Sequence, residues 1–261
     1  MNEKTRLGGS PPAYTQGFRT TFASLSLHEG DKIRMLGFPK QICETVKQVI
    51  ANTWSGGVQR VQDYYGSYEI KMVGYPWNAT HSDAVTSRQL MSRILAALFA
   101  AGWVLNLSTD VTKLTSDLDT LLFRHQDPAP VPCEWLAISF SNGDQIRFLW
   151  DHRKYAKDPV VAAYISAIGK AVQSHQPHKL PGCYEVKMNG YPWRARHGES
   201  IHARGLLLSL LSTLEQYGWT VYASVDQKKQ RQSENSTSGD TDTWHCCRRV
   251  GWEPGMPVFH N

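Results

Sequence analysis

The chain has 261 residues, of which 41% are hydrophobic and 20% are charged, and nine of them are tryptophan. This composition excludes an intrinsically disordered chain, and the length suits two domains of ordinary size. The formal net charge of +5 comes from 28 basic and 23 acidic residues with no basic block. Nucleic-acid binding is therefore permitted by the charge but not indicated by it.

An internal duplication dominates the sequence. Residues 68–77 read YEIKMVGYPW and return as YEVKMNGYPW at residues 184–193. At this offset of 116 residues, positions 68–110 align with 184–226 without a gap, and 18 of the 43 pairs are identical. Unrelated segments match at roughly one position in fifteen or twenty, so the two copies are expected to share a fold.

The duplication divides the chain into two predicted units. Unit 1 is expected at residues 21–126 and unit 2 at residues 135–250, joined by a proline-rich linker at 127–134. Residues 1–20 are rich in Gly and Pro and predict a flexible leader, and residues 251–261 form a tail. A polar stretch at 227–240, which makes unit 2 longer, predicts a mobile loop.

Hydrophobic periodicity predicts the same elements in both units. Unit 1 opens with a predicted hairpin of strands 22–27 and 32–36, followed by a helix ending near Trp54, a strand at 68–72, a helix at 83–101, and strands at 103–107 and 121–123. Unit 2 repeats this order from 135–140 to 244–247, with Asp158 and Pro159 as the expected start of its first helix. The sequence therefore predicts an α+β fold, a tandem ββαβαββ duplication in which two helices pack on one face of a mainly antiparallel sheet and the other face is solvated.

The Gly-Tyr-Pro-Trp segment at residues 74–77 and 190–193 has two interpretations. Trp77 and Trp193 could close the core between strand and helix, or Tyr75, Trp77, Tyr191 and Trp193 could form a recognition rim, because Tyr and Trp join a large apolar body to a polar tip. The packing role is favoured, since buried aromatic residues usually pack before they bind. If the segment binds a ligand or partner, Tyr75 and Tyr191 are the expected contacts.

The ionisable residues that match between the copies include His81 with His197 and Arg88 with Arg204. Near the start of the second helix of each unit, these side chains and the free backbone N–H groups could hold an anion. In the alternative, Arg88 pairs with Asp110 or Glu69. The pairing role is favoured because it is common for such residues.

No motif names a reaction. The five cysteines lack metal-ligand spacing, which predicts reduced thiols, no metal site and no cofactor. No phosphate-binding glycine loop and no nucleophile motif is present. His245 and Cys246 are adjacent in a predicted strand, so their side chains are expected on opposite faces, which argues against a thiol activated by that histidine.

Three functions remain open. The leading hypothesis is a non-enzymatic interaction or scaffold protein whose two modules bind an unidentified protein partner. The second is binding of an anionic ligand, a phospholipid headgroup or nucleic acid, near Arg88 and Arg204, and the third is an enzyme with its site in the cleft between the units. Because the sequence shows no signal peptide and no apolar run long enough to span a bilayer, a cytoplasmic or nuclear protein is expected.

Overall fold

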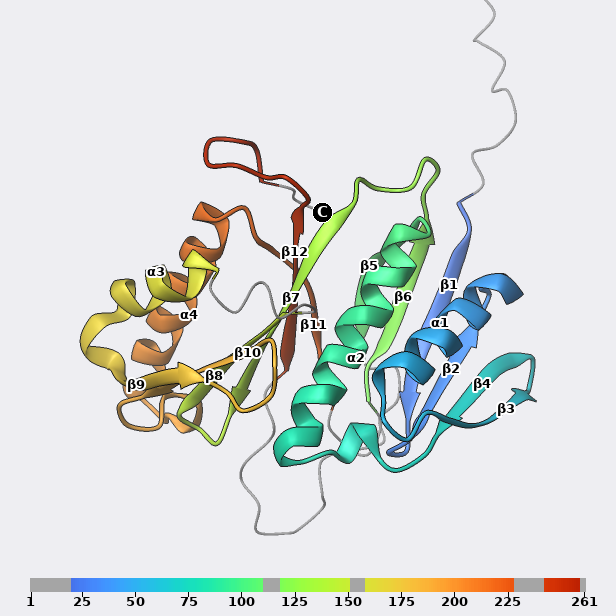
Figure 1. Cartoon of the computed structure of the whole chain (residues 1–261), viewed down its shortest axis with the longest axis horizontal. Coiled ribbons are helices and arrows are strands. Elements are labelled where there is room, and N and C mark those ends of the chain that lie inside the picture. Colours follow the sequence, from blue (N-terminus) through green and yellow to red (C-terminus); the bar gives the residue numbers. More distant parts are fainter. Residues whose placement is uncertain (1–19, 110–117, 151–157, 228–241, 259–261) are drawn as a thin grey trace, which may run out of the picture.

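A computed structural model describes residues 20–109, 118–150, 158–227 and 242–258. Within these ranges the chain forms two six-stranded antiparallel sheets and four α-helices (Figure 1). The leader predicted at residues 1–20 and the loop predicted at 227–240 lie almost wholly outside the described ranges, as does Asp110.

Unit 1 forms the first sheet, with strand order β3-β4-β2-β1-β6-β5. Its elements in chain order are β1 (Phe22–His28), β2 (Lys32–Leu36), α1 (Lys40–Thr53), β3 (Val58–Tyr64), β4 (Ser67–Met72), the 3-10 turn η1 (Pro76–Asn78), α2 (His81–Ala100), β5 (Trp103–Thr109) and β6 (Thr120–His125).

Unit 2 forms the second sheet, with strand order β9-β10-β8-β7-β12-β11. Its elements are β7 (Cys133–Ser141), β8 (Gln145–Trp150), α3 (Pro159–Ile168), the 3-10 turn η3 (Gly169–Ala171), β9 (Val172–Pro177), β10 (Cys183–Met188), the 3-10 turn η4 (Pro192–Arg194), α4 (Glu199–Gln216), β11 (Thr220–Val225) and β12 (Thr243–Arg249). The two orders are the same element for element, which confirms the predicted tandem α+β duplication.

The structure adds one strand to the predicted order of each unit, so that the described order is ββαββαββ. The added strands are β3 and β9, which lie at the outer edges of the two sheets. Neither buries a single residue fully, and β9 has the sequence VQSHQP. An edge strand that covers no core has no alternating apolar pattern to reveal it, so its pairing comes from the backbone ladder alone.

Helix ends follow the local rules that predicted them. The side chain of Asp158 accepts a hydrogen bond from the backbone N–H of Val160 at 3.0 Å, and Pro159 is the first residue of α3. After α2 the chain turns at Gly102, whose φ of +83° lies in the left-handed region that glycine adopts without a steric penalty. The predicted start at Asp158 and Pro159 is confirmed, and α2 ends one residue before the predicted end at residue 101.

Each unit buries the inward side chains of its strands under its own helices. In unit 1, Leu25, Ile33 and Ile70 come from three neighbouring strands and pack in one cluster with Val46 of α1 and Leu95 of α2. The core of unit 2 is built in the same way beneath α3 and α4. The alternation of buried and exposed residues along β1 and β2 reflects the two faces of a strand.

The second sheet is covered on both faces, which the sequence did not predict. α2 lies between the two sheets (Figure 1) and brings Val85 against Ala137, Leu149 and Cys183 on the face of the second sheet that points away from α3 and α4. The expected solvated face is therefore wrong for this sheet. α2 can pack in two directions because it has buried residues around most of its circumference.

Candidate functional site

The tryptophans of the repeated Gly-Tyr-Pro-Trp segment pack, as the favoured interpretation expected. Trp77 is 1% exposed, and its Nε1 donates a hydrogen bond to the carbonyl oxygen of Lys32 at 3.0 Å. Trp193 is half-buried and donates in the same way to Gln145 at 3.1 Å. Each indole thereby ties the end of a strand to the start of the hairpin's second strand.

The tyrosines of the same segment point to solvent. Tyr75 is 67% exposed and Tyr191 is 64% exposed, and each is the residue before a short 3-10 turn. The proline that follows keeps both tyrosines out of the helical region, with φ −132° and ψ 70° at Tyr75 and φ −130° and ψ 65° at Tyr191. The structure thus separates a packed tryptophan from an accessible tyrosine in each unit, and a binding role for the tyrosines stays a prediction.

The paired histidines mark the starts of two helices. His81 opens α2 and His197 precedes α4, both exposed and both with a left-handed φ, 54° and 51°. The carbonyl oxygen of His197 accepts hydrogen bonds from the backbone N–H and the hydroxyl of Ser200. The contacts at His197 organise the chain entering the helix.

The paired arginines differ in their surroundings. Arg88 is half-buried and donates to the hydroxyl of Thr243 in unit 2 at 3.2 Å, whereas Arg204 is exposed and donates to the hydroxyl of Ser200 at 3.3 Å. Glu69, one of the carboxylates suggested for Arg88, pairs instead with Arg34 at 2.7 Å. Arg88 therefore belongs to the interface between the units, and an anion site there or at Arg204 stays a prediction.

One side of α2 forms a large part of the interface between the units, and β5 and β11 also meet there. Val85, Arg88, Gln89, Ser92 and Phe99 follow helical spacing along this side, which we call the α2 docking face. The side-chain amide of Gln89 donates to the carbonyl oxygen of Trp150 at 3.2 Å. The Phe99 ring lies edge-on to Trp135 and Tyr222, with centroid distances of 5.6 and 5.4 Å.

His245 lies deep in this interface. It is fully buried, and neither ring nitrogen has a hydrogen-bond partner among the described residues. Burial, with a smaller contribution from the positive charge of Arg88, lowers the pKa of His245 to about 3. Cys246 faces the other way, into the core of unit 2, where burial raises the pKa of its thiol. This confirms that the two side chains lie on opposite faces.

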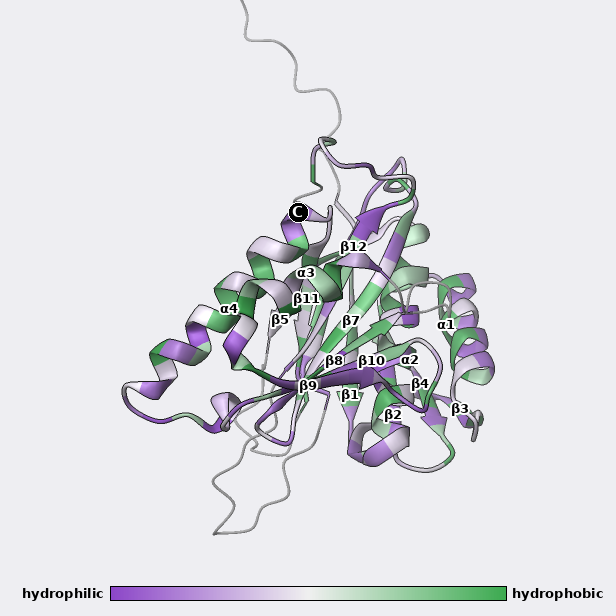
Figure 2. Cartoon of the chain, turned by 60° about the vertical axis from the view of Figure 1, so that its left-hand side comes forward, coloured by the Kyte–Doolittle hydropathy of each residue, from purple (hydrophilic) through white to green (hydrophobic). Residues whose placement is uncertain are grey.

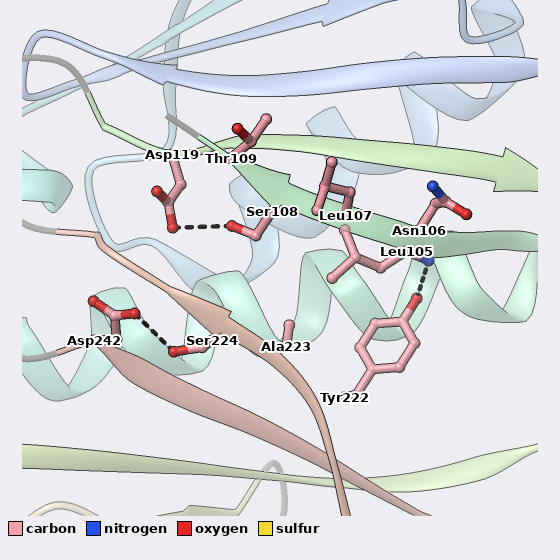
Figure 3. Close-up of a pocket in the computed structure, with 10 residues that line it drawn as sticks. All are labelled: Leu105, Asn106, Leu107, Ser108, Thr109, Asp119, Tyr222, Ala223, Ser224 and Asp242. Atoms are coloured by element: carbon pink, nitrogen blue, oxygen red, sulfur yellow. Dashed lines mark hydrogen bonds between the residues drawn. The ribbon is translucent and has the colours of Figure 1, made fainter. Parts of the chain in front are cut away.

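A groove of about 490 Å³ runs between β5 and β11, at the junction of the two units (Figure 3). The hydroxyl of Ser108 donates to Asp119 at 3.0 Å, and that of Ser224 donates to Asp242 at 2.8 Å. These are the same pair in each copy. Among the described residues, the lining holds two carboxylates and no basic side chain, so this part of the groove can accept hydrogen bonds and attract a cation. It is also the inter-unit cleft in which an enzyme site was hypothesised, and that hypothesis stays a prediction.

α4 presents apolar side chains to solvent. It lies at the outside of the molecule, where hydrophobic and hydrophilic residues alternate along it (Figure 2). Ile201 is 65% exposed, Leu208 64% and Leu211 40%. In the sequence, these exposed residues could be found only by aligning the two helices, because residues 201 and 208 fall at the positions of Val85 and Ser92 on the α2 docking face. The leucine pattern alone gave no reason to single them out.

A second hollow of about 530 Å³ lies where α3 and η3 meet α4. Lys170, Asn189 and His202 supply polar groups to its lining, together with Gly205 and Ser209. The corresponding position in unit 1 holds Arg93, whose guanidinium donates to the hydroxyl of Thr53. Replacement of this long side chain by Ser209 leaves space in unit 2.

In the part of the chain that the structure describes, no helix is both long and apolar enough to cross a membrane, and no three His, Cys, Asp or Glu side chains gather as a metal site. All five cysteines are free.

Comparison with known proteins identifies the repeated domain. The sequence model of one domain family matches the chain twice, at residues 21–124 and 134–247. No curated protein and no solved structure matches the chain significantly. The family match therefore concerns the repeated domain itself and carries no reaction, ligand or partner with it.

Proposed function

The chain belongs to the family of this domain, which it carries twice, and we propose that it is a non-enzymatic interaction or scaffold protein whose modules bind a protein partner. The observation that carries the proposal is the exposed apolar side of α4, formed by Ile201, Leu208 and Leu211. We call it the α4 face. Exposed apolar residues that gather on one helix face are typical of protein interaction sites.

The packing of the equivalent face of α2 supports this proposal. In unit 1 the equivalent side of α2 is buried against a sheet, with Val85 only 1% exposed where Ile201 is 65% exposed. Removing a large aliphatic side chain from water stabilises a complex by roughly 1.5–3 kcal/mol. The α4 face therefore offers a partner the kind of contact that already holds the two units together.

A photo-crosslinking residue at position 208 tests the proposal in cells that express the chain. We expect adducts with a protein, and we expect them to disappear when Ile201→Asp is introduced on the same face. The matched control carries the same crosslinker at Tyr65, which is 93% exposed in the β3–β4 turn. Adducts at position 208 that are no stronger than at position 65, or that survive Ile201→Asp, would refute a partner site on α4.

Anionic-ligand binding is the second candidate, and the hollow beside α4 favours it. Lys170 and His202 contribute positive or protonatable groups to the hollow, and Asn189 contributes an amide. Fluorescence anisotropy with a labelled inositol phosphate headgroup tests this function. Binding that weakens steeply with salt and with Lys170→Ala supports it, while absent or salt-insensitive binding eliminates it.

A further inference from the structure

The shared strand order gives every position of the second sheet a counterpart in the first. On the second sheet a row of four paired residues, Leu149, Ala137, His245 and Ala223, is buried on the side that α2 covers. The counterpart row on the first sheet is Leu36, Ser24, Leu122 and Leu107. We call this side of the first sheet the open face.

The open face keeps apolar residues that solvent reaches. Leu36 is 53% exposed and Leu107 is 51% exposed. Phe22 is 57% exposed, and its counterpart on the second sheet is Trp135, which is 8% exposed and contacts Phe99 of α2. Apolar side chains thus occupy the positions that would contact a helix if one packed there as α2 packs on the second sheet.

The α4 face is the matching half of this arrangement. Ile201 and Leu208 take the positions of Val85 and Ser92 on the α2 docking face, so α4 is more apolar than α2 at these two positions. Within the described ranges, the chain therefore has one helix face that no sheet covers and one sheet face that no helix covers. Both are duplicates of surfaces that pack against each other inside the molecule.

We propose that α4 of one copy packs on the open face of a second copy, which repeats between two chains the packing of α2 on the second sheet. This inference rests on the proposed function and identifies the partner of the α4 face as the chain itself. The internal interface predicts the contacts. Val85 packs with Leu149, so Ile201 packs with Leu36 of the second copy.

A polar pair, Arg204 with Thr120, supports a second copy as the partner. Arg88 donates to Thr243 inside the chain, and their counterparts Arg204 and Thr120 have the same residue types and are available for the same hydrogen bond between chains. Thr120 lies at the start of β6, as Thr243 lies at the start of β12. The two chains therefore share a polar contact that the apolar residues alone would not require.

The remaining pair shows complementary charge. Phe99 of α2 contacts Trp135, and Cys247 is paired beside Trp135 on the neighbouring strand. The counterpart of Phe99 on α4 is Glu215. On the open face, Arg124 is paired beside Phe22 as Cys247 is beside Trp135. An apolar contact inside the chain is thus matched by an acidic and a basic residue on the two exposed surfaces.

The contact joins two different surfaces, so each copy retains one free surface of each kind. Such a heterologous contact forms a closed ring or an open chain of copies, whereas a symmetric dimer uses the same surface on both partners. This property separates the proposal from a simple pairing of two α4 faces.

Analytical ultracentrifugation of the purified full-length chain tests the proposal. We expect species larger than the 29.5 kDa monomer at raised concentration. Ile201→Asp blocks the α4 face and Leu36→Asp blocks the open face, and each is expected to weaken self-association by at least about tenfold. Tyr65→Asp, an equally exposed change in the β3–β4 turn, is the control and should leave association unchanged.

Mixing the two blocked variants gives the decisive measurement. Each retains the surface that the other lacks, so an equimolar mixture should form a 1:1 dimer and nothing larger. Loss of association with Ile201→Asp alone, no effect of Leu36→Asp, and a mixture in which Leu36→Asp pairs only with itself would instead show a symmetric α4 contact and overturn the proposal. A monomer at every concentration would also overturn it, but adducts of position 208 with another protein would leave the proposed function standing.

Exchanging the charges of Glu215 and Arg124 tests the predicted contact between these two residues without large changes to the surface. Glu215→Arg and Arg124→Glu should each weaken association, and the double variant should restore it because opposite charges face each other again. Circular dichroism verifies that each variant is folded. Failure of the double variant to recover association, with both single variants folded, would contradict the predicted placement of these two residues.

Discussion

Replacing Phe99 by alanine measures how strongly α2 joins the two units. The side chain is 1% exposed and lies edge-on to Trp135 and Tyr222 of unit 2. Truncation of a buried phenylalanine costs about 3–5 kcal/mol, of which aromatic contacts supply about 0.5–1.5 kcal/mol each. We therefore expect Phe99→Ala to lower the free energy of unfolding by about 4 kcal/mol.

The duplication supplies a matched control for this experiment. Glu215 is the counterpart of Phe99 in α4 and is exposed, so Glu215→Ala should change the stability of the monomeric chain by less than about 0.5 kcal/mol. Urea unfolding followed by tryptophan fluorescence measures both variants, with Trp135 beside the substituted ring as a reporter. If Phe99→Ala costs no more than Glu215→Ala, α2 does not hold the second sheet and the reasoning about both interfaces fails.

Three further predictions concern charge and backbone. Burial lowers the pKa of His245 from 6.5 to about 3, so as pH falls the unfolded chain takes up the proton at a higher pH than the folded chain does. The free energy of unfolding should therefore fall by about 1.4 kcal/mol per pH unit below pH 6. His245→Leu, which introduces the residue type of the counterpart Leu122, should remove this pH dependence from the melting temperature. Burial alone would raise the pKa of Glu69, but the hydrogen bonds that its carboxylate accepts, the strongest from Arg34, lower this pKa overall. Stability is therefore lost as pH falls through the pKa of Glu69. Arg34→Ala should cost about 2 kcal/mol and move the acid loss to higher pH in urea titrations. Gly205→Ala, on exposed α4 with open space at its Cβ position, should stabilise by about 0.5–1 kcal/mol in thermal unfolding, and a lower melting temperature would contradict this.

The sequence predicted those parts of the fold in which local pattern and tertiary packing agree. Alternation along residues 22–36 and helical spacing from 90 to 99 have one origin, a side that faces the core of the same unit. The repeat strengthened each assignment, because both copies had to satisfy it. β3 and β9 were missed because they lie at sheet edges and bury nothing fully.

The interface between the units could not be predicted from the same signals. A residue such as Val85 is apolar in sequence whether it faces its own sheet or another one, and periodicity does not distinguish the two. The retained pair Arg88 and Arg204 was visible, but its environment differs between the copies. Only the three-dimensional arrangement shows that one arginine is in an interface and the other is on the surface.

The shared fold explains some identities between the copies but not others. Identical pairs such as Trp77 and Trp193 make the same hydrogen bond in both units, so the shared fold is sufficient to explain them. Arg204 and Thr120 are different, because the fold of their own units requires no bond between them, yet both keep the residue types of a pair that bonds elsewhere.

The substitutions on the two exposed surfaces also change together. Phe99 corresponds to Glu215, and Cys247 corresponds to Arg124, so an apolar pairing has become one of opposite charge. A surface that had merely lost its partner would be expected to lose its large apolar residues, since exposed apolar patches favour aggregation. Ile201 and Leu36 remain apolar and more than half exposed. Retained apolar residues with complementary charges at their margin are what a second, intermolecular use of the same interface requires.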